Sequence, residues 1–140
     1  MIISLNHVAL AVSDLEKAVS RFKNDIGLAF SDTEVLPHIN TQTSFFPING
    51  DTINLELIHP LNEKGPVHDY LKKKGPGLHH ICFETDNIQE EIERLKSKNY
   101  QFTTKGPIVG AHGSKAIFIH PKCCDGVLIE ICQLKAKIRE

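Results

Sequence analysis

Four residues in this sequence have side chains that bind metal ions, and they recur as two matched pairs. His7 and His80 each follow a leucine and a polar residue, precede three apolar residues, and lie 73 positions apart. Glu56 and Glu130 each interrupt an apolar run and lie 74 positions apart. Imidazole nitrogens and carboxylate oxygens are ligands of divalent transition metals. Each half of the chain therefore offers one histidine and, further along, one glutamate for a metal site.

Strand periodicity places these four side chains opposite the apolar faces of their strands. Side chains alternate between the two faces of a strand, so residues of one parity share a face. The apolar residues of the other parity, which we expect to pack on helices, are Val8, Leu10, Val12, Ile53, Leu55, Leu57, Ile81, Phe83, Val127, Ile129 and Ile131. A carboxylate within an apolar strand is costly unless it is paired or bound to a metal. We therefore favour one metal held by both pairs over the alternative of four half-exposed surface residues.

An amphipathic helix is expected directly after the first strand of each half. Ser13 with Glu16, and Asp86 with Gln89, have the spacing of a capping box, in which two side chains satisfy backbone amides at a helix start. The apolar stripes repeat at the same distance of 73 residues and comprise Leu15, Val19 and Phe22, then Ile88, Ile92 and Leu95. The helices therefore support the same internal repeat as the candidate ligands.

The remaining strands complete two βαβββ modules, so the expected fold class is α+β. Apolar and β-branched runs predict strands at 5–12, 28–36, 41–48, 52–58, 78–84, 100–105, 115–120 and 127–133. We expect one domain over 1–140, with module one at about 4–58, a connector with a short helix at 59–76, and module two at about 77–133. The tandem modules should form a cupped mixed sheet around a central metal site.

The composition excludes several classes of partner. The 16 basic and 17 acidic residues nearly balance, which disfavours binding to nucleic acid or to an anionic membrane surface. No apolar run approaches the roughly 20 residues of a membrane span, and no signal-peptide pattern opens the sequence, so we expect a cytoplasmic protein. The four cysteines lack disulfide-scaffold and zinc-finger spacing, and we expect reduced thiols.

Other histidines and cysteines are weaker candidates for a site. His59 and His68 fall in the connector, where we expect them to be solvated, and His79 has the wrong parity for the metal-binding face. His112 and His120 flank the last hairpin, where either a substrate contact or a surface position is open. The adjacent pair at 123–124 could bind a metal or undergo oxidation, but adjacent cysteines bridge poorly, and we favour a loop position.

These features together resemble the vicinal oxygen chelate (glyoxalase/bleomycin resistance/dioxygenase) superfamily. Its members include glyoxalase I, extradiol dioxygenases, fosfomycin and bleomycin resistance proteins, and methylmalonyl-CoA epimerases. The similarity is greatest to the epimerase group and covers about residues 4–133. The stretches that carry it are 6–12, 14–16, 75–83, 108–113, 120–122 and 126–130.

The resemblance implies a site and a reaction. It implies that His7, Glu56, His80 and Glu130 are the metal ligands, and that Glu130 also acts as an acid/base. The metal would be cobalt, manganese, nickel or zinc, among which affinity order cannot choose. The implied substrate is a small acyl-CoA, epimerised by removal and return of a proton through a metal-stabilised enolate. A homodimer is also implied.

Two positions depart from the epimerase pattern. That group has a glutamate acid/base in the turn after the second strand, where this chain has His38 after Leu36-Pro37. Histidine exchanges protons near neutral pH, so we expect His38 to be the second acid/base. The stretch 123–125, Cys-Cys-Asp, replaces small polar residues and could change how the acyl group is seated.

Alternative functions on the same fold remain open. One is a glyoxalase-like isomerase or an epimerase of another small acid. Another is a non-enzymatic binding protein of the resistance type, against which the complete ligand set argues. A ring-cleaving dioxygenase uses two histidines and one carboxylate, so the fourth candidate ligand, Glu56, disfavours it.

Overall fold

The computed structural model describes residues 1–50 and 52–137, which divide into two compact units. One unit is His7–His79, and the other combines Met1–Asn6 with the described residues from His80 onward. The long strands β1 (Ile2–Ala11) and β5 (Gly77–Thr85) each contribute residues to both units. The units therefore do not coincide with the sequence modules, each of which begins at one of these strands.

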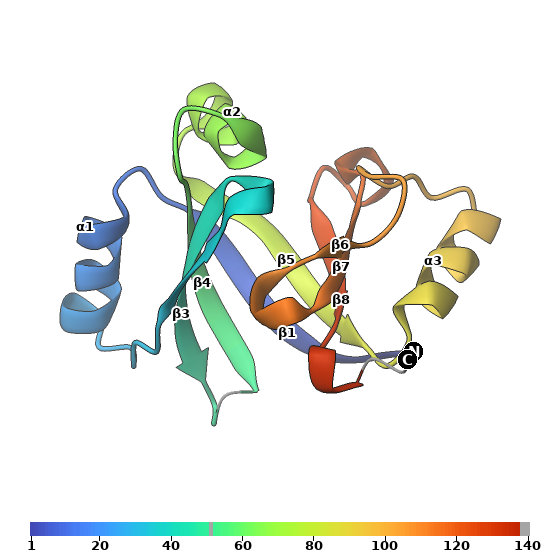
Figure 1. Ribbon diagram of the computed structural model, residues 1–140, viewed down its shortest axis with the longest axis horizontal. Helices are drawn as coiled ribbons and strands as arrows, with labels where there is room; N and C mark the ends of the chain where they lie inside the picture. Colours follow the sequence, from blue (N-terminus) through green and yellow to red (C-terminus); the bar gives the residue numbers. More distant parts are fainter. Residues whose placement is uncertain (51, 138–140) are drawn as a thin grey trace. The chain divides into compact units, whose positions relative to one another are not determined.

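The unit His7–His79 contains a sheet in the order β2-β3-β4-β1 (Figure 1). β1 runs parallel to β4, whereas β4 with β3 and β3 with β2 are antiparallel. The strands that follow β1 are β2 (Thr33–Leu36), β3 (Thr41–Ile48) and β4 (Ile53–Pro60). The helices are α1 (Leu15–Ser20), a π-helical extension η1 (Arg21–Asp25), the 3₁₀ turn η2 (Pro37–Ile39) and α2 (Gly65–Lys74).

The second unit repeats this plan in the order β5-β8-β7-β6. β5 runs parallel to β8, and the β8–β7 and β7–β6 pairs are antiparallel. Its other strands are β6 (Ile108–Val109), β7 (Lys115–Ile119) and β8 (Ile129–Gln133). Its helices are α3 (Ile88–Ser97) and the short 3₁₀ turns η3 (Ala111–Gly113), η4 (Pro121–Cys123) and η5 (Lys135–Lys137). The βαβββ repeat and the α+β class with mixed pairing are confirmed.

The helix caps lie one residue later than predicted in both modules. Asp14 caps α1 and accepts a hydrogen bond from the Lys17 amide, and Asn87 caps α3 and accepts one from the Glu90 amide. Both caps have extended backbone angles, as N-cap residues do. With the cap shifted, the third helical position is Lys17 or Glu90, so the predicted capping boxes do not form. The two true caps are themselves 73 residues apart.

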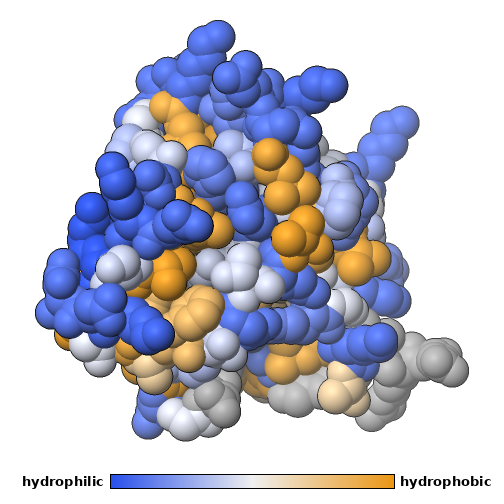
Figure 2. Space-filling view, turned by 60° about the vertical axis from the view of Figure 1, so that its left-hand side comes forward, coloured by the Kyte–Doolittle hydropathy of each residue, from blue (hydrophilic) through white to orange (hydrophobic). Residues whose placement is uncertain are grey.

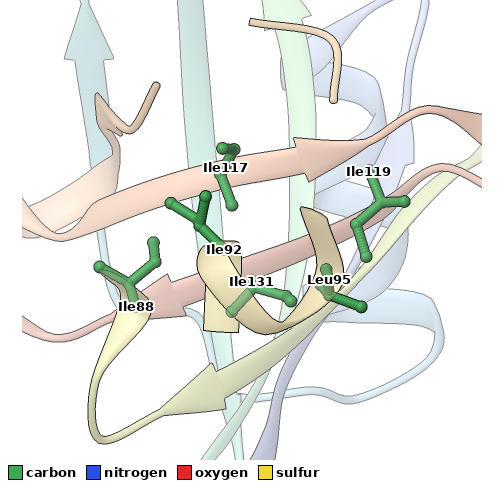
Figure 3. Close-up of a cluster of buried hydrophobic side chains, with 6 residues drawn as sticks. All are labelled: Ile88, Ile92, Leu95, Ile117, Ile119 and Ile131. Atoms are coloured by element: carbon green, nitrogen blue, oxygen red, sulfur yellow. The ribbon is translucent and has the colours of Figure 1, made fainter. Parts of the chain in front are cut away.

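The predicted apolar stripe of α3 forms the core of the second unit (Figure 3). The stripe packs on the helix-facing side of β7 and β8, where Ile131 is 4 % exposed and Ile117 is fully buried. The six buried members are Ile88, Ile92, Leu95, Ile117, Ile119 and Ile131. Burying each such side chain stabilises the fold by about 1.5–3 kcal/mol.

An equivalent core lies beneath α1 in the unit His7–His79. Ala18 of α1 packs with Val12, Phe46 and Leu57, and Leu10 and Leu55 pack against this cluster. These strand residues have the parity predicted for the helix-covered face, so that prediction is confirmed. Ala9 and Ala11, of the opposite parity, pack with Ile58 and Val67 beneath α2.

Other sequence predictions need correction. Residues 100–105 do not form a strand: only Phe102 makes an isolated bridge, to Ile119, and the edge strand is β6 further along. The strand predicted at 28–36 is confined to β2. Val127 precedes β8, is 37 % exposed and does not pack in the core.

The surface carries hydrophobic side chains in separate patches among hydrophilic ones (Figure 2). Within the described residues, none of the helices has both the length and the apolar character needed to cross a membrane.

Candidate metal-binding and active-site residues

The first predicted pair meets within the unit His7–His79. An imidazole N–H of His7, at Nδ1, donates to Glu56 Oε2 over 2.9 Å. Each residue is only 6 % exposed. The parallel pairing of β1 with β4 explains the contact, because Ala9 is the Cα partner of Glu56 and His7 is two residues earlier on the same face.

The second predicted pair meets in the other unit. His80 Nε2 donates to Glu130 Oε1 over 3.0 Å, and these residues are 6 % and 7 % exposed. Here Cys82 is the Cα partner of Glu130, and His80 is two residues earlier. Phe118, the partner of Glu130 on β7, packs edge-to-face with the His80 ring.

The two pairs occupy equivalent positions in the repeat. Ala9 pairs with Glu56 as Cys82 pairs with Glu130, at offsets of 82 − 9 = 73 and 130 − 56 = 74 residues. The same strand register thus places a histidine beside a glutamate twice. The sequence offset alone indicated this relationship, and the strand pairing supplies its cause.

The chemistry of both pairs fits a divalent metal ion. Each pair offers one imidazole nitrogen and one carboxylate oxygen within hydrogen-bond distance, so the donor atoms are already gathered. A buried carboxylate loses most of its hydration and needs a cation or hydrogen-bond donors in compensation. Mixed nitrogen and oxygen donors suit zinc and neighbouring transition metals.

Cys82 is a buried donor that the sequence interpretation did not include. Its Sγ and a Glu130 carboxylate oxygen lie within 4.8 Å of each other, and the residue is fully buried. Its parity with His80 could have identified it, because residues two apart on a strand share a face. It was overlooked because its counterpart in the first module, Ala9, has no donor atom.

His38, the predicted second acid/base, lies in the exposed turn η2 between β2 and β3. It is in the same unit as His7 and Glu56, whereas Glu130 belongs to the other unit.

The remaining histidines and the cysteine pair take varied positions. His59 lies in β4, and its Nδ1 is 2.7 Å from the Val12 carbonyl, so the solvated position expected for it was wrong. His79 packs edge-to-face on Tyr70, and the His120 ring accepts a hydrogen bond from the Lys122 amide. Burial raises the pKa of the Cys124 thiol, which disfavours a reactive thiolate at neutral pH.

The fold and these residues define the class of protein. The chain belongs to the glyoxalase/bleomycin resistance protein/dioxygenase superfamily, whose family model matches residues 6–118. Within this class the chain is similar to methylmalonyl-CoA epimerases along nearly its whole length.

Three relatives illustrate the similarity. The chain is 43 % identical to the human mitochondrial methylmalonyl-CoA epimerase over 130 residues, 92 % of this chain and 73 % of that protein. It is 38 % identical to the ethylmalonyl-CoA/methylmalonyl-CoA epimerase of Cereibacter sphaeroides, over 96 % of this chain and all of that protein. A structure of a Streptomyces coelicolor methylmalonyl-CoA epimerase variant with 2-nitronate-propionyl-CoA aligns with a TM-score of 0.92 and 29 % identity, over 97 % of both chains. The vicinal oxygen chelate fold expected from the sequence is therefore confirmed.

Proposed function

We propose that this protein is a metal-dependent epimerase of methylmalonyl-CoA or a closely similar acyl-CoA thioester. The observation that carries the proposal is the pair of buried His–Glu contacts in equivalent strand registers. Relatives named as methylmalonyl-CoA epimerases support the choice of substrate.

The proposed metal site takes one divalent ion, which we propose to be cobalt, manganese, nickel or zinc. Its protein ligands would be His7, Glu56, His80 and Glu130. The burial of all four, at 6–7 % exposed, supports this choice, because buried carboxylates need a cation in compensation. This arrangement requires the two sequence modules to act as one domain, which is part of the proposal. When bound, the ion supplies positive charge that lowers the energy of an enolate.

The chain's own residues would move the proton. One acid/base takes the proton from the carbon between the thioester and the carboxylate, leaving the electron pair in the enolate. The other donates a proton to the opposite face of that carbon, which inverts its configuration. We assign these roles to Glu130 and His38, each serving one face.

Two further features belong to the proposal. The free thiols of Cys82, Cys123, Cys124 and Cys132 support a reducing compartment, and we propose the cytoplasm. We also propose a homodimer, as the family resemblance implies, which sedimentation equilibrium would test.

The decisive experiment is proton exchange at C2 of a panel of acyl-CoAs in deuterated water, followed by NMR with metal-supplemented protein. We expect deuterium incorporation with inversion for methylmalonyl-CoA, and none for propionyl-CoA, which lacks the second carboxylate. Hemithioacetal isomerisation, measured in parallel, tests the glyoxalase-like alternative. Ligand binding without exchange in any compound would instead support a binding protein.

A further inference from the structure

We infer that Asn40 is a positioning residue that fastens the His38 turn to the connector before α2. This inference rests on the proposed role of His38 as an acid/base. Asn40 is the residue at which η2 ends and β3 begins, two positions after His38. It touches neither of the His–Glu pairs through any contact recorded among the described residues.

The backbone of Asn40 closes the turn in a conformation that few residues adopt. Its φ of 53° and ψ of 42° are left-handed, a region that asparagine tolerates better than most non-glycine residues. Its amide donates to the Pro37 carbonyl over 3.1 Å, and its carbonyl accepts from the Leu61 amide over 3.1 Å. The turn is thus closed on one side and tied to the connector on the other.

The side chain of Asn40 adds two bonds to the connector. Its Nδ2 donates to Asn62 Oδ1 over 2.9 Å and to the Lys64 carbonyl over 2.5 Å. Both acceptors lie in the segment immediately before α2. The turn that carries His38 and the segment leading to α2 are therefore held side by side (Figure 1).

The connector is shaped to receive this side chain. Gly65 begins α2 with a φ of +91°, and a Cβ built on it would lie 3.4 Å from the Asn40 Cβ. The position therefore favours glycine both for its backbone angle and for the neighbouring side chain.

An exposed acid/base is effective only while its turn holds it at the reacting carbon. A misplacement of about 1 Å can cost a hundredfold in rate. Because His38 is exposed, its position depends on the turn more than on packing around its ring. The Asn40 bonds are the contacts that fix this turn to the rest of the unit.

The test compares Asn40→Gly with Asn49→Gly. Glycine keeps the left-handed backbone and removes only the side-chain bonds, so it isolates the fastening. Asn49 is also left-handed, with a φ of 56°, but lies in the β3–β4 hairpin of the same unit, so it controls for the flexibility that glycine adds. Heteronuclear NMR relaxation at the His38 amide measures the order of the turn without reference to activity.

We expect the heteronuclear NOE of His38 to fall in Asn40→Gly and to stay unchanged in Asn49→Gly. In deuterated water, starting from the epimer whose proton faces Glu130, the ratio of inversion to same-face exchange should fall at least about tenfold in Asn40→Gly alone. A loss of folded protein would lower both rates together and leave this ratio unchanged.

The outcomes separate this inference from the proposed function. An unchanged NOE at His38 in Asn40→Gly would overturn the fastening, whatever the activity. A lowered NOE with an unchanged inversion ratio would overturn the positioning role. If wild-type protein exchanges no acyl-CoA proton, the proposed function fails, and the catalytic part of this inference falls with it.

Discussion

The imidazole of His80 packs edge-to-face against Phe118, with ring centroids 5.3 Å apart and planes inclined at 86°. Such contacts contribute about 0.5–1.5 kcal/mol beyond simple burial. Phe118→Leu keeps an apolar side chain but removes the ring that orients His80. We expect the affinity for a divalent metal to fall by up to about tenfold, measured by competition with a chromogenic chelator.

The matched control for this change is Phe30→Leu. Phe30 packs on Phe46 with centroids 5.5 Å apart, in the core beneath α1. We expect it to lower the melting temperature without weakening metal binding in the folded protein. Equal loss of affinity in both variants would show that Phe118 contributes only to stability.

Replacing either histidine of the candidate site should abolish stable metal binding. We expect purified wild-type protein to carry about one divalent ion per chain and His7→Ala or His80→Ala to bind at least about a hundredfold more weakly, since losing a ligand exceeds the 10- to 100-fold cost of losing a supporting residue. His112→Ala, in the exposed turn η3, is the control. Elemental analysis with equal low occupancy in all four proteins would refute the assignment.

The parity of the strand residues allowed much of the fold and of the site to be predicted. Faces could be assigned because alternation is a property of the backbone, and both His–Glu pairs fell on the predicted faces. The repeat offset added the strand pairing, since equal registers in two modules give equal offsets.

What the sequence did not predict depended on finer competition between residues. Ser13 and Asp86 are good caps, but Asp14 and Asn87 beside them cap the helices instead, and propensity hardly separates such neighbours. The segment 103–106, Thr-Thr-Lys-Gly, has no apolar alternation to support the strand predicted there. The position of His38 relative to Glu130 involves both units and stays a prediction.

The roles of Glu130 as a ligand and as an acid/base can be separated by Glu130→Gln. The amide keeps an oxygen that can bind a metal and accept from His80, but it cannot take up a proton. We expect metal to remain at least partly bound while C2 exchange falls by about a hundredfold or more. Unchanged exchange in the metal-loaded variant would confine Glu130 to ligation, and Glu90→Gln on the exposed side of α3 provides the control for the substitution.

Stability at low pH should depend on Glu91, a buried residue of α3. Burial by itself would raise the pKa of this carboxyl, but hydrogen bonds from Arg94 and the Met1 ammonium outweigh burial and lower it. The Arg94 Nη2 and the ammonium nitrogen lie 2.6 Å and 2.9 Å from its oxygens. Because the folded-state pKa is lower than the unfolded one, the contribution to stability is present above the unfolded pKa and is lost as pH falls through the folded pKa.

This sign gives a measurable difference between Glu91→Gln and wild type. The variant should be less stable in urea at pH 7, and the difference should shrink as pH is lowered below about 4.3, the ordinary glutamate value. Glu90→Gln, one residue earlier and exposed, should show a much smaller effect at either pH. A difference between Glu91→Gln and wild type that stays constant down to pH 3 would contradict the ion-pair explanation.

The boundary between the two units falls between Asn6 and His7 and again between His79 and His80. Both candidate histidine ligands therefore stand where the chain passes from one unit to the other, while Glu56 and Glu130 lie within the units. An ion that took ligands from both pairs would fasten the two crossings, so its binding energy would be shared by both units. Unfolding should then be a single cooperative event in the metal-loaded protein and become separable by calorimetry after chelation. The metal would in that case govern cooperativity of folding as well as chemistry.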